Sequence, residues 1–223
     1  MMLFKRYLTR GKIRVIITMC VFILSCASHN SVSLTRTQSP DPYEQGLVLL
    51  KQLKYGEAKA SFDKAIASNP KHKKAFYYRG TARIELGQLD SAKIDFDKSL
   101  KIDPEYALGY VGRAQVYIKK KDYPMAMEQL SKAQTLEPNN SEAFYQKGVV
   151  YGYQQKVQEA IESFKRCIEI KPDFAYAHYQ IGLAFYQIKR PDLTIVHFER
   201  FLMLAPTAPE AEQVRRLLSS LRR

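Results

Sequence analysis

Prolines that recur every 34 residues constrain the fold of this chain more than any other feature of its sequence. They are Pro70, Pro104, Pro138, Pro172 and Pro206. Alignment on them produces three further columns. The first column contains small residues: Gly46, Gly80, Ala114, Gly148 and Gly182. The second contains alanine in four copies, Ala58, Ala92, Ala126 and Ala160, and Thr194 in the fifth. The third contains large apolar residues: Phe62, Phe96, Leu130, Phe164 and Phe198. Self-similarity at such a period indicates an array of one repeated unit.

Each unit has the pattern of two helices joined by a turn. Apolar residues recur at helical intervals, as from Ala160 to Ile168, and turn signals such as Leu86–Leu89 separate two such stretches. The proline at the end of the unit cannot continue a helix, so it ends the second one. A single hairpin leaves one apolar face bare. The units are therefore predicted to stack into an all-α solenoid.

The glycine column predicts close packing between the two helices of a unit. Glycine inside a helix is less favourable than alanine by about 1 kcal/mol. Its recurrence therefore indicates that a neighbouring helix approaches there. We expect the alanine of the second helix to face the glycine, and the phenylalanine four residues later to fill the adjacent gap.

These columns resemble the tetratricopeptide repeat (TPR), whose 34-residue pattern is W-x2-L-G-x2-Y, then A-x3-F, then P. Phe76, Tyr110, Phe144 and His178 stand at the Trp position, and Pro42 stands there in the weaker first copy. The Leu position departs from the pattern, because it is basic in three copies: Arg79, Arg113 and Lys147.

The resemblance implies a right-handed superhelical solenoid of five TPR repeats. They would span 39–72, 73–106, 107–140, 141–174 and 175–208, and residues 41–208 would form the repeat domain. Residues 209–223 would form a capping helix, because an end repeat otherwise exposes its core. The capping residues would be Val214, Leu217, Leu218 and Leu221.

In TPR solenoids the first helices line a concave face, and the resemblance implies which positions do so. In this chain the lining residues would be Tyr77, Tyr78, Gln115, Lys119, Tyr145, Gln146, Tyr153, Tyr176, Tyr179, Gln180 and Tyr186, with Lys74 beside them. Tyrosine offers a large contact area and a hydroxyl group at low entropic cost, which suits peptide recognition. The alternative is that several of these tyrosines only pack between adjacent helices.

A carboxylate clamp known from some TPR domains is missing. Its Lys and Asn positions hold Tyr43 and Leu47 in the first copy and Tyr77 and Thr81 in the second, while Gly112 and Glu142 occupy later clamp positions. Binding of chaperone C-terminal tails is therefore disfavoured.

The N-terminus has the three-part layout of an export signal. Residues 1–14 are basic, and Val15–Leu24 is an apolar run of 10 residues. This run is shorter than the roughly 20 residues that span a bilayer. Ile23–Cys26 resembles a bacterial lipobox, although Leu24 departs from its commonest form. The resemblance implies a signal peptide at 1–25, a lipidated Cys26 and a tether at 26–40. Cleavage without lipidation and an uncleaved anchor remain open.

The positive charge does not point to nucleic acid. The formal charge is +13, and five of the basic residues precede residue 15, in a segment of 25 residues without Asp or Glu. Beyond that segment the longest basic run is Lys119–Lys121. We interpret the charge as a solvated surface and expect no nucleic-acid partner.

The sequence predicts no catalytic residue, metal site or cofactor. It lacks the motifs of hydrolases and nucleotide-binding loops. Cys20, Cys26 and Cys167 form neither a disulfide framework nor a zinc site, and Cys167 is predicted to lie in the core. His29 and His72 fall in the tether and in a turn. His178 and His197 are interpreted as packing residues.

We therefore predict a non-enzymatic adaptor that binds a protein or peptide. Its lipid on Cys26 would hold it to the bacterial cell envelope, at the periplasmic face of the outer membrane. A second hypothesis is binding of an anionic polymer or membrane surface through Lys119–Lys121 and the arginine-rich tail. A third is an enzyme subunit or an unrecognised hydrolase.

Overall fold

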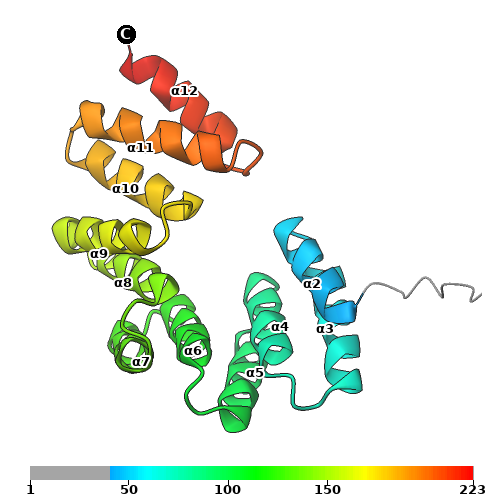
Figure 1. The fold of residues 1–223 in the computed structure, drawn as a ribbon. Helices are drawn as coiled ribbons and strands as arrows, with labels where there is room; N and C mark the ends of the chain where they lie inside the picture. Colours follow the sequence, from blue (N-terminus) through cyan, green and yellow to red (C-terminus); the bar gives the residue numbers. More distant parts are fainter. Residues whose placement is uncertain (1–40, 223) are drawn as a thin grey trace, which may run out of the picture. The chain divides into compact units, whose positions relative to one another are not determined.

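The computed structural model describes residues 41–222, and every regular element within them is an α-helix (Figure 1). The helices are α2 (Pro42–Lys51), α3 (Tyr55–Ser68), α4 (Lys73–Glu85), α5 (Leu89–Ile102), α6 (Ala107–Lys119), α7 (Tyr123–Leu136), α8 (Ser141–Tyr153), α9 (Val157–Ile170), α10 (Ala175–Gln187), α11 (Pro191–Leu204) and α12 (Ala211–Leu221). The predicted all-α class is confirmed. In this part of the chain no helix is long and apolar enough to cross a membrane. The predicted signal peptide, the lipid anchor Cys26 and the tether at 26–40 lie outside the described residues.

The helices pack in consecutive pairs, and each pair packs on the next. We name the first helix of each pair an A helix (α2, α4, α6, α8 and α10) and the second a B helix (α3, α5, α7, α9 and α11). Each B helix that precedes another repeat contacts both its own A helix and the A helix that follows. From α2 to α8, successive A helices also contact one another, whereas within residues 41–222 no two B helices meet to a similar extent. The A helices therefore line the inner side of the stack.

The glycine column exists because a phenylalanine ring lies against it. A Cβ atom on Gly46, Gly80, Gly148 or Gly182 would lie 2.5–2.7 Å from the Phe ring of the same repeat. This corrects one detail of the prediction. The nearest neighbour of the glycine is the ring itself, and not the alanine one turn earlier. In the third repeat both partners change together, because Ala114 and Leu130 take these positions and share one fully buried cluster.

Two of the three basic residues at the Leu position, Arg79 and Arg113, form ion pairs between repeats, which explains their departure from the TPR pattern. Arg79 Nη1 lies 2.7 Å from Asp63 Oδ1 of the preceding repeat. Arg113 Nε likewise lies 2.6 Å from Asp97 Oδ1 of the repeat before its own. Arg79 also donates two hydrogen bonds, of 2.9 and 2.6 Å, to the fully buried Asp95. The long side chains thus cover the seam between repeats.

The turn between A and B helices places one residue in the left-handed region in every repeat. Its φ is 60° at Leu53, 74° at Gly87, 62° at Lys121, 60° at Gln155 and 57° at Lys189. Only glycine adopts this conformation without a steric cost. Four of the five turns therefore carry strain that the stack of helices must offset.

The two ends of the described stack differ from its middle. At the start, Pro42 occupies the first turn of α2, where its missing N–H costs nothing, and the Asp41 side chain accepts from the N–H of Tyr43 at 3.1 Å. At the end, α12 packs Val214 and Leu218 against Phe198 and Phe201. Helix α12 thus covers apolar residues of the last repeat.

Candidate binding groove

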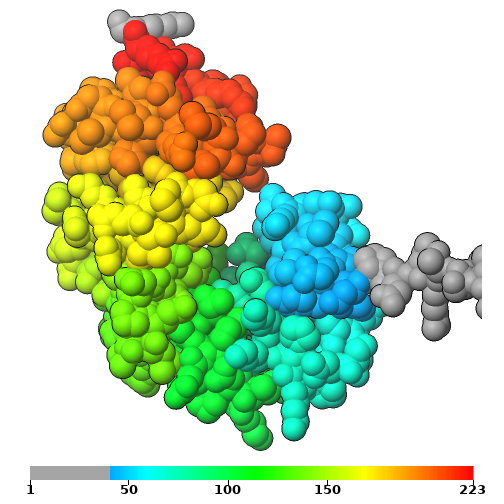
Figure 2. All heavy atoms as spheres, viewed as in Figure 1, coloured from blue at the N-terminus to red at the C-terminus, as the bar shows by residue number. Residues whose placement is uncertain are grey.

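A pocket of about 280 Å³ is lined only by A helices, namely α4, α6, α8 and α10. Figure 2 shows this side as the hollowed surface between the blue α2 segment and the yellow α10 segment. Six of the predicted groove residues line it: Gln115, Lys119, Tyr145, Gln146, Tyr153 and Gln180. The pocket therefore joins residues from four repeats at one place on the inner side.

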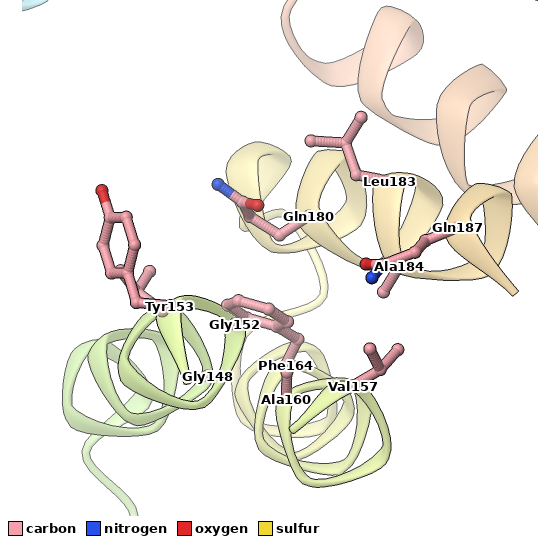
Figure 3. A pocket seen from close by; sticks show the side chains of 11 residues that line it. Gly148, Gly152, Tyr153, Val157, Ala160, Phe164, Gln180, Leu183, Ala184 and Gln187 are labelled. Atoms are coloured by element: carbon pink, nitrogen blue, oxygen red, sulfur yellow. The ribbon is translucent and has the colours of Figure 1, made fainter. Parts of the chain in front are cut away.

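A second pocket, of about 330 Å³, lies between α8, α9 and α10 (Figure 3). Tyr153 and Gln180 line this pocket as well as the first. Next to Tyr153, Gly152 has open space where a side chain would project. The two pockets are therefore neighbours along one surface, which we call the groove, and Tyr153 belongs to both.

Two of the predicted tyrosines are well exposed. The accessible fraction is 61% for Tyr153 and 47% for Tyr186. The Tyr153 ring stacks on the Tyr123 ring at a centroid distance of 5.8 Å, with 16° between their planes. Tyr123 thus supports one face of the Tyr153 ring and leaves the rest of it available. This is the geometry of a side chain that can bind a partner.

Tyr145, Tyr176 and Tyr179 are only partly available, because each also packs on the core. The Tyr145 ring stacks on Phe174 at 4.8 Å, and the Tyr179 ring lies 5.1 Å from Phe201. The Tyr176 hydroxyl donates to Glu210 Oε2 at 3.1 Å. Burial, together with that carboxylate, raises the pKa of Tyr176 to about 12. Truncating any of these rings would therefore damage packing, and truncating Tyr145 would also alter the groove.

Tyr77 belongs to the core, so its assignment to the groove was wrong. Only 6% of Tyr77 is exposed, and its ring packs 5.7 Å from Phe96. Burial raises its pKa well above the usual value. The alternative interpretation of the tyrosines, packing between helices, holds at this position. Tyr78, Tyr176, Tyr179, Tyr186 and Lys74 line neither pocket.

Sequence reasoning missed a carboxylate beside the groove, that of Glu142 in the first turn of α8. Its Oε1 accepts from Gln146 Nε2 at 3.0 Å and from Gln115 Nε2 at 3.5 Å. Burial raises the pKa of Glu142, although the bond from Gln146 and the charge of Lys171 act against it. Glu142 stands at the second position of its repeat, one of the lining positions that the TPR resemblance implies. The repeat position of Glu142 therefore indicated a groove residue, but comparison with the carboxylate clamp alone did not identify it.

Three of the six described cations that an anionic surface would use lie in ion pairs. Lys120 Nζ lies 2.7 Å from Asp90 Oδ1, Arg215 pairs with Glu212, and Arg222 pairs with Glu199. Lys119 and Lys121 are exposed, but Lys119 lines the groove. These pairs lower the net positive charge at the two places, while Lys119, Lys121 and Arg216 form no ion pair within residues 41–222.

Cys167 and the histidine pair lie in packed surroundings. Cys167 is fully buried, and burial raises the pKa of its thiol to about 12. His178 and His197 approach each other with 3.2 Å between their Nδ1 atoms, and His178 Nε2 lies 3.2 Å from the Pro172 carbonyl oxygen. Across residues 41–222, no cluster of three or more His, Cys, Asp or Glu side chains is arranged to hold a metal ion.

Models of repeat families match most of this stack. A tetratricopeptide-repeat model matches residues 43–107, another matches 107–140, and a TPR-repeat model matches 153–189. A comparison with curated protein sequences gives no match.

Solved structures show the same fold at low sequence identity. A thermophilic TPR protein of Thermus thermophilus gives a TM-score of 0.70 at 20% identity, over 81% of this chain and 96% of its own. The APC/C hetero-tetramer Cut9–Hcn1 gives 0.68 at 19% identity, over 81% of this chain and 35% of its own. MamA gives 0.50 at 22% identity, over 72% of this chain and 94% of its own. At these identities the likeness concerns the fold alone.

Proposed function

This chain belongs to the tetratricopeptide-repeat family, a fold of protein-interaction scaffolds, and we propose that it is such a scaffold and is non-catalytic. It binds an extended peptide segment of a partner protein in the groove. The observation that carries the proposal is the place of Tyr153. It is 61% exposed, stacked on Tyr123, and shared by the two adjoining pockets.

The chemistry of the groove suits a peptide. A supported tyrosine offers apolar area and a hydroxyl group without losing much side-chain entropy on binding. Gln115 and Gln180 each carry an amide that can donate to and accept from a peptide backbone. Gly152 leaves room for a chain to pass beside Tyr153. Pockets of this size each fit one side chain, and two in succession fit a short extended segment.

We also propose that the scaffold is tethered to the bacterial envelope through lipid on Cys26, at the periplasmic face of the outer membrane. The support is the sequence of the N-terminus: an apolar run, Val15–Leu24, that ends at Ser25-Cys26. Two or more acyl chains give stable anchoring, whereas one gives marginal anchoring.

The groove proposal is tested by selecting binders from a random peptide library on the purified protein. Affinities of the selected peptides are then measured for the parent, for Tyr153→Ala and for the control Val196→Ala. Val196 is 58% exposed on the B helix α11, so its truncation removes apolar surface away from the groove.

We expect Tyr153→Ala to weaken binding at least tenfold, about 1.4 kcal/mol, because interface energy concentrates in a few aromatic anchors. Val196→Ala should bind like the parent. A library without any enriched peptide, or equal losses in the two variants, would overturn the proposal. Enrichment of acidic peptides alone, released by added salt, would instead favour the anionic-surface hypothesis.

A further inference from the structure

We propose, in an inference that rests on the groove function above, that the partner segment carries a lysine or arginine whose charged group binds the carboxylate of Glu142. The occupant of the groove is thus a basic peptide, and Glu142 selects it.

The carboxylate of Glu142 has one oxygen in use and one free. Both amide donors, Gln146 Nε2 and Gln115 Nε2, bind Oε1. Within residues 41–222, Oε2 accepts no hydrogen bond and no cation lies within 4.0 Å of the carboxylate. The side-chain atoms that are both buried and unbonded there are Arg83 Nε, Tyr106 Oη and Gln129 Oε1. Oε2 is not one of them, so it is an unpaired acceptor that solvent, or a ligand, can reach.

The surroundings favour a cation at this oxygen. Removing a carboxylate from water is unfavourable unless a counter-charge accompanies it. The raised pKa of Glu142 reflects that imbalance, and Lys171 offsets it only from a distance. An ammonium or guanidinium group of a ligand would supply the missing charge and a charge-assisted hydrogen bond. The bound amides of Gln115 and Gln146 meanwhile hold the carboxylate in place.

Three tyrosine hydroxyls lie within electrostatic reach of the same carboxylate. The charge of Glu142 acts on Tyr77 and Tyr78 of α4 and on Tyr145 of α8, and raises the pKa of all three, after burial. Tyr77 and Tyr78 meet edge to face at 5.0 Å. Aromatic faces attract cations through their quadrupole, and they do so more strongly where water is excluded. A carboxylate with one free oxygen and tyrosines within electrostatic reach therefore favours a basic side chain over an acidic one.

Other charges of the groove do not compete for this place. Lys119 lines the groove, but it lies a full helical turn from Gln115 at the exposed end of α6, and Glu85 lines the same pocket. Their opposite charges offset each other. Glu85 thereby provides a matched control, as a glutamate that lines this pocket but accepts no hydrogen bond from Gln115 or Gln146.

The test compares the parent with Glu142→Gln and with Glu85→Gln in the peptide selection described above. Glutamine keeps an oxygen that can accept from Gln146 and Gln115, so the tie between α6 and α8 remains while the charge is lost. For the parent and Glu85→Gln, we expect selected peptides enriched in Lys or Arg at one position. Glu142→Gln should lose that enrichment and keep the apolar preferences.

A thermodynamic cycle completes the test. In the most enriched peptide, replacing the basic residue by norleucine should weaken binding to the parent at least tenfold and should weaken binding to Glu142→Gln less than twofold. Peptides enriched through Tyr153 but without a basic residue, or equal losses in parent and Glu142→Gln, would overturn this inference and leave the groove function standing. A selection that enriches nothing on the parent would overturn both.

Discussion

The ring of Phe164 occupies the space in which a side chain on Gly148 would lie, with its Cε1 atom 2.5 Å from that Cβ position. The third repeat shows the other solution to the same contact. There Ala114 replaces the glycine and the smaller Leu130 replaces the ring, and both are fully buried. The two positions therefore depend on each other within every hairpin.

Gly148→Ala is expected to destabilise the protein by about 1–3 kcal/mol, because the added methyl group overpacks the contact with Phe164. The gain in helix propensity, about 1 kcal/mol, offsets only part of this. The larger Gly148→Leu should be worse.

The pair can be tested as a cycle, with Gly148→Ala, Phe164→Leu and the double variant in chemical denaturation. The double variant copies the third repeat, so it should be more stable than the sum of the single effects predicts, by about 1 kcal/mol or more. Additive losses would show that the two residues are not coupled.

Asp95→Ala is expected to lower the free energy of unfolding by about 3–5 kcal/mol, because it removes a fully buried carboxylate and leaves the cations paired with it without that counter-charge. Arg79 and Arg83 both pair with Asp95, at 2.6 Å each. The control is Asp97→Ala on the same helix. Its carboxylate is 35% exposed and pairs with Lys93 and Arg113, so its loss should cost about 1 kcal/mol or less. Urea denaturation of both variants measures the two losses of unfolding free energy. Similar losses would contradict the different contributions assigned to Asp95 and Asp97.

The His178–His197 pair predicts a loss of stability in mild acid. The Pro172 carbonyl can only accept, so His178 carries its hydrogen on Nε2 and accepts at Nδ1, to which His197 donates. Protonating His178 would place a second N–H group against that of His197, whereas His197 takes its second proton at Nε2, away from this contact. Burial, then the charges of His178 and Lys165, lowers the pKa of His197 to about 4. Burial also lowers the pKa of His178, against the bond to Pro172, and Arg200 adds to the effect.

Both folded-state pKa values lie below the unfolded value of about 6.5, so the unfolded chain binds protons first. Stability is therefore full above about pH 6.5 and is lost as the pH falls towards 4. From about pH 8 to about pH 5 the loss from His197 should be about 1–2 kcal/mol, allowing for solvent screening of a half-buried group. His197→Gln should reduce that difference in urea denaturation. An unchanged pH dependence would mean that other groups cause it.

Cys26→Ala is expected to abolish incorporation of labelled fatty acid and to release the protein from the membrane fraction, because the acyl chains supply the anchoring energy. Ser31→Ala, which lies outside the lipobox and leaves the cysteine in place, serves as the control. Membrane retention of Cys26→Ala without any lipid signal would indicate an uncleaved anchor.

The basic residues at the Leu position show that the repeat pattern does not predict which side chains pair between helices. Arg79, Arg113 and Lys147 are visible in the aligned sequence, but their partners lie in other helices. The carboxylates of Asp63 and Asp97 precede Arg79 and Arg113 by 16 residues, and Lys147 donates to Gln134 at 3.1 Å. A repeat pattern records which positions recur. It does not state which side chains of two neighbouring repeats meet.

The sequence by itself determined the all-α class and the pairing of helices within each 34-residue unit. These follow from local rules: helical spacing of apolar residues, glycine where helices approach, and proline where they stop. Only the tertiary structure decided which inner-face residues are accessible. Tyr77 and Tyr153 both stand at lining positions, but Tyr77 is 6% exposed and Tyr153 is 61% exposed. The reason is that accessibility depends on how far each A helix is covered by its neighbours, and the packing of several repeats sets that coverage.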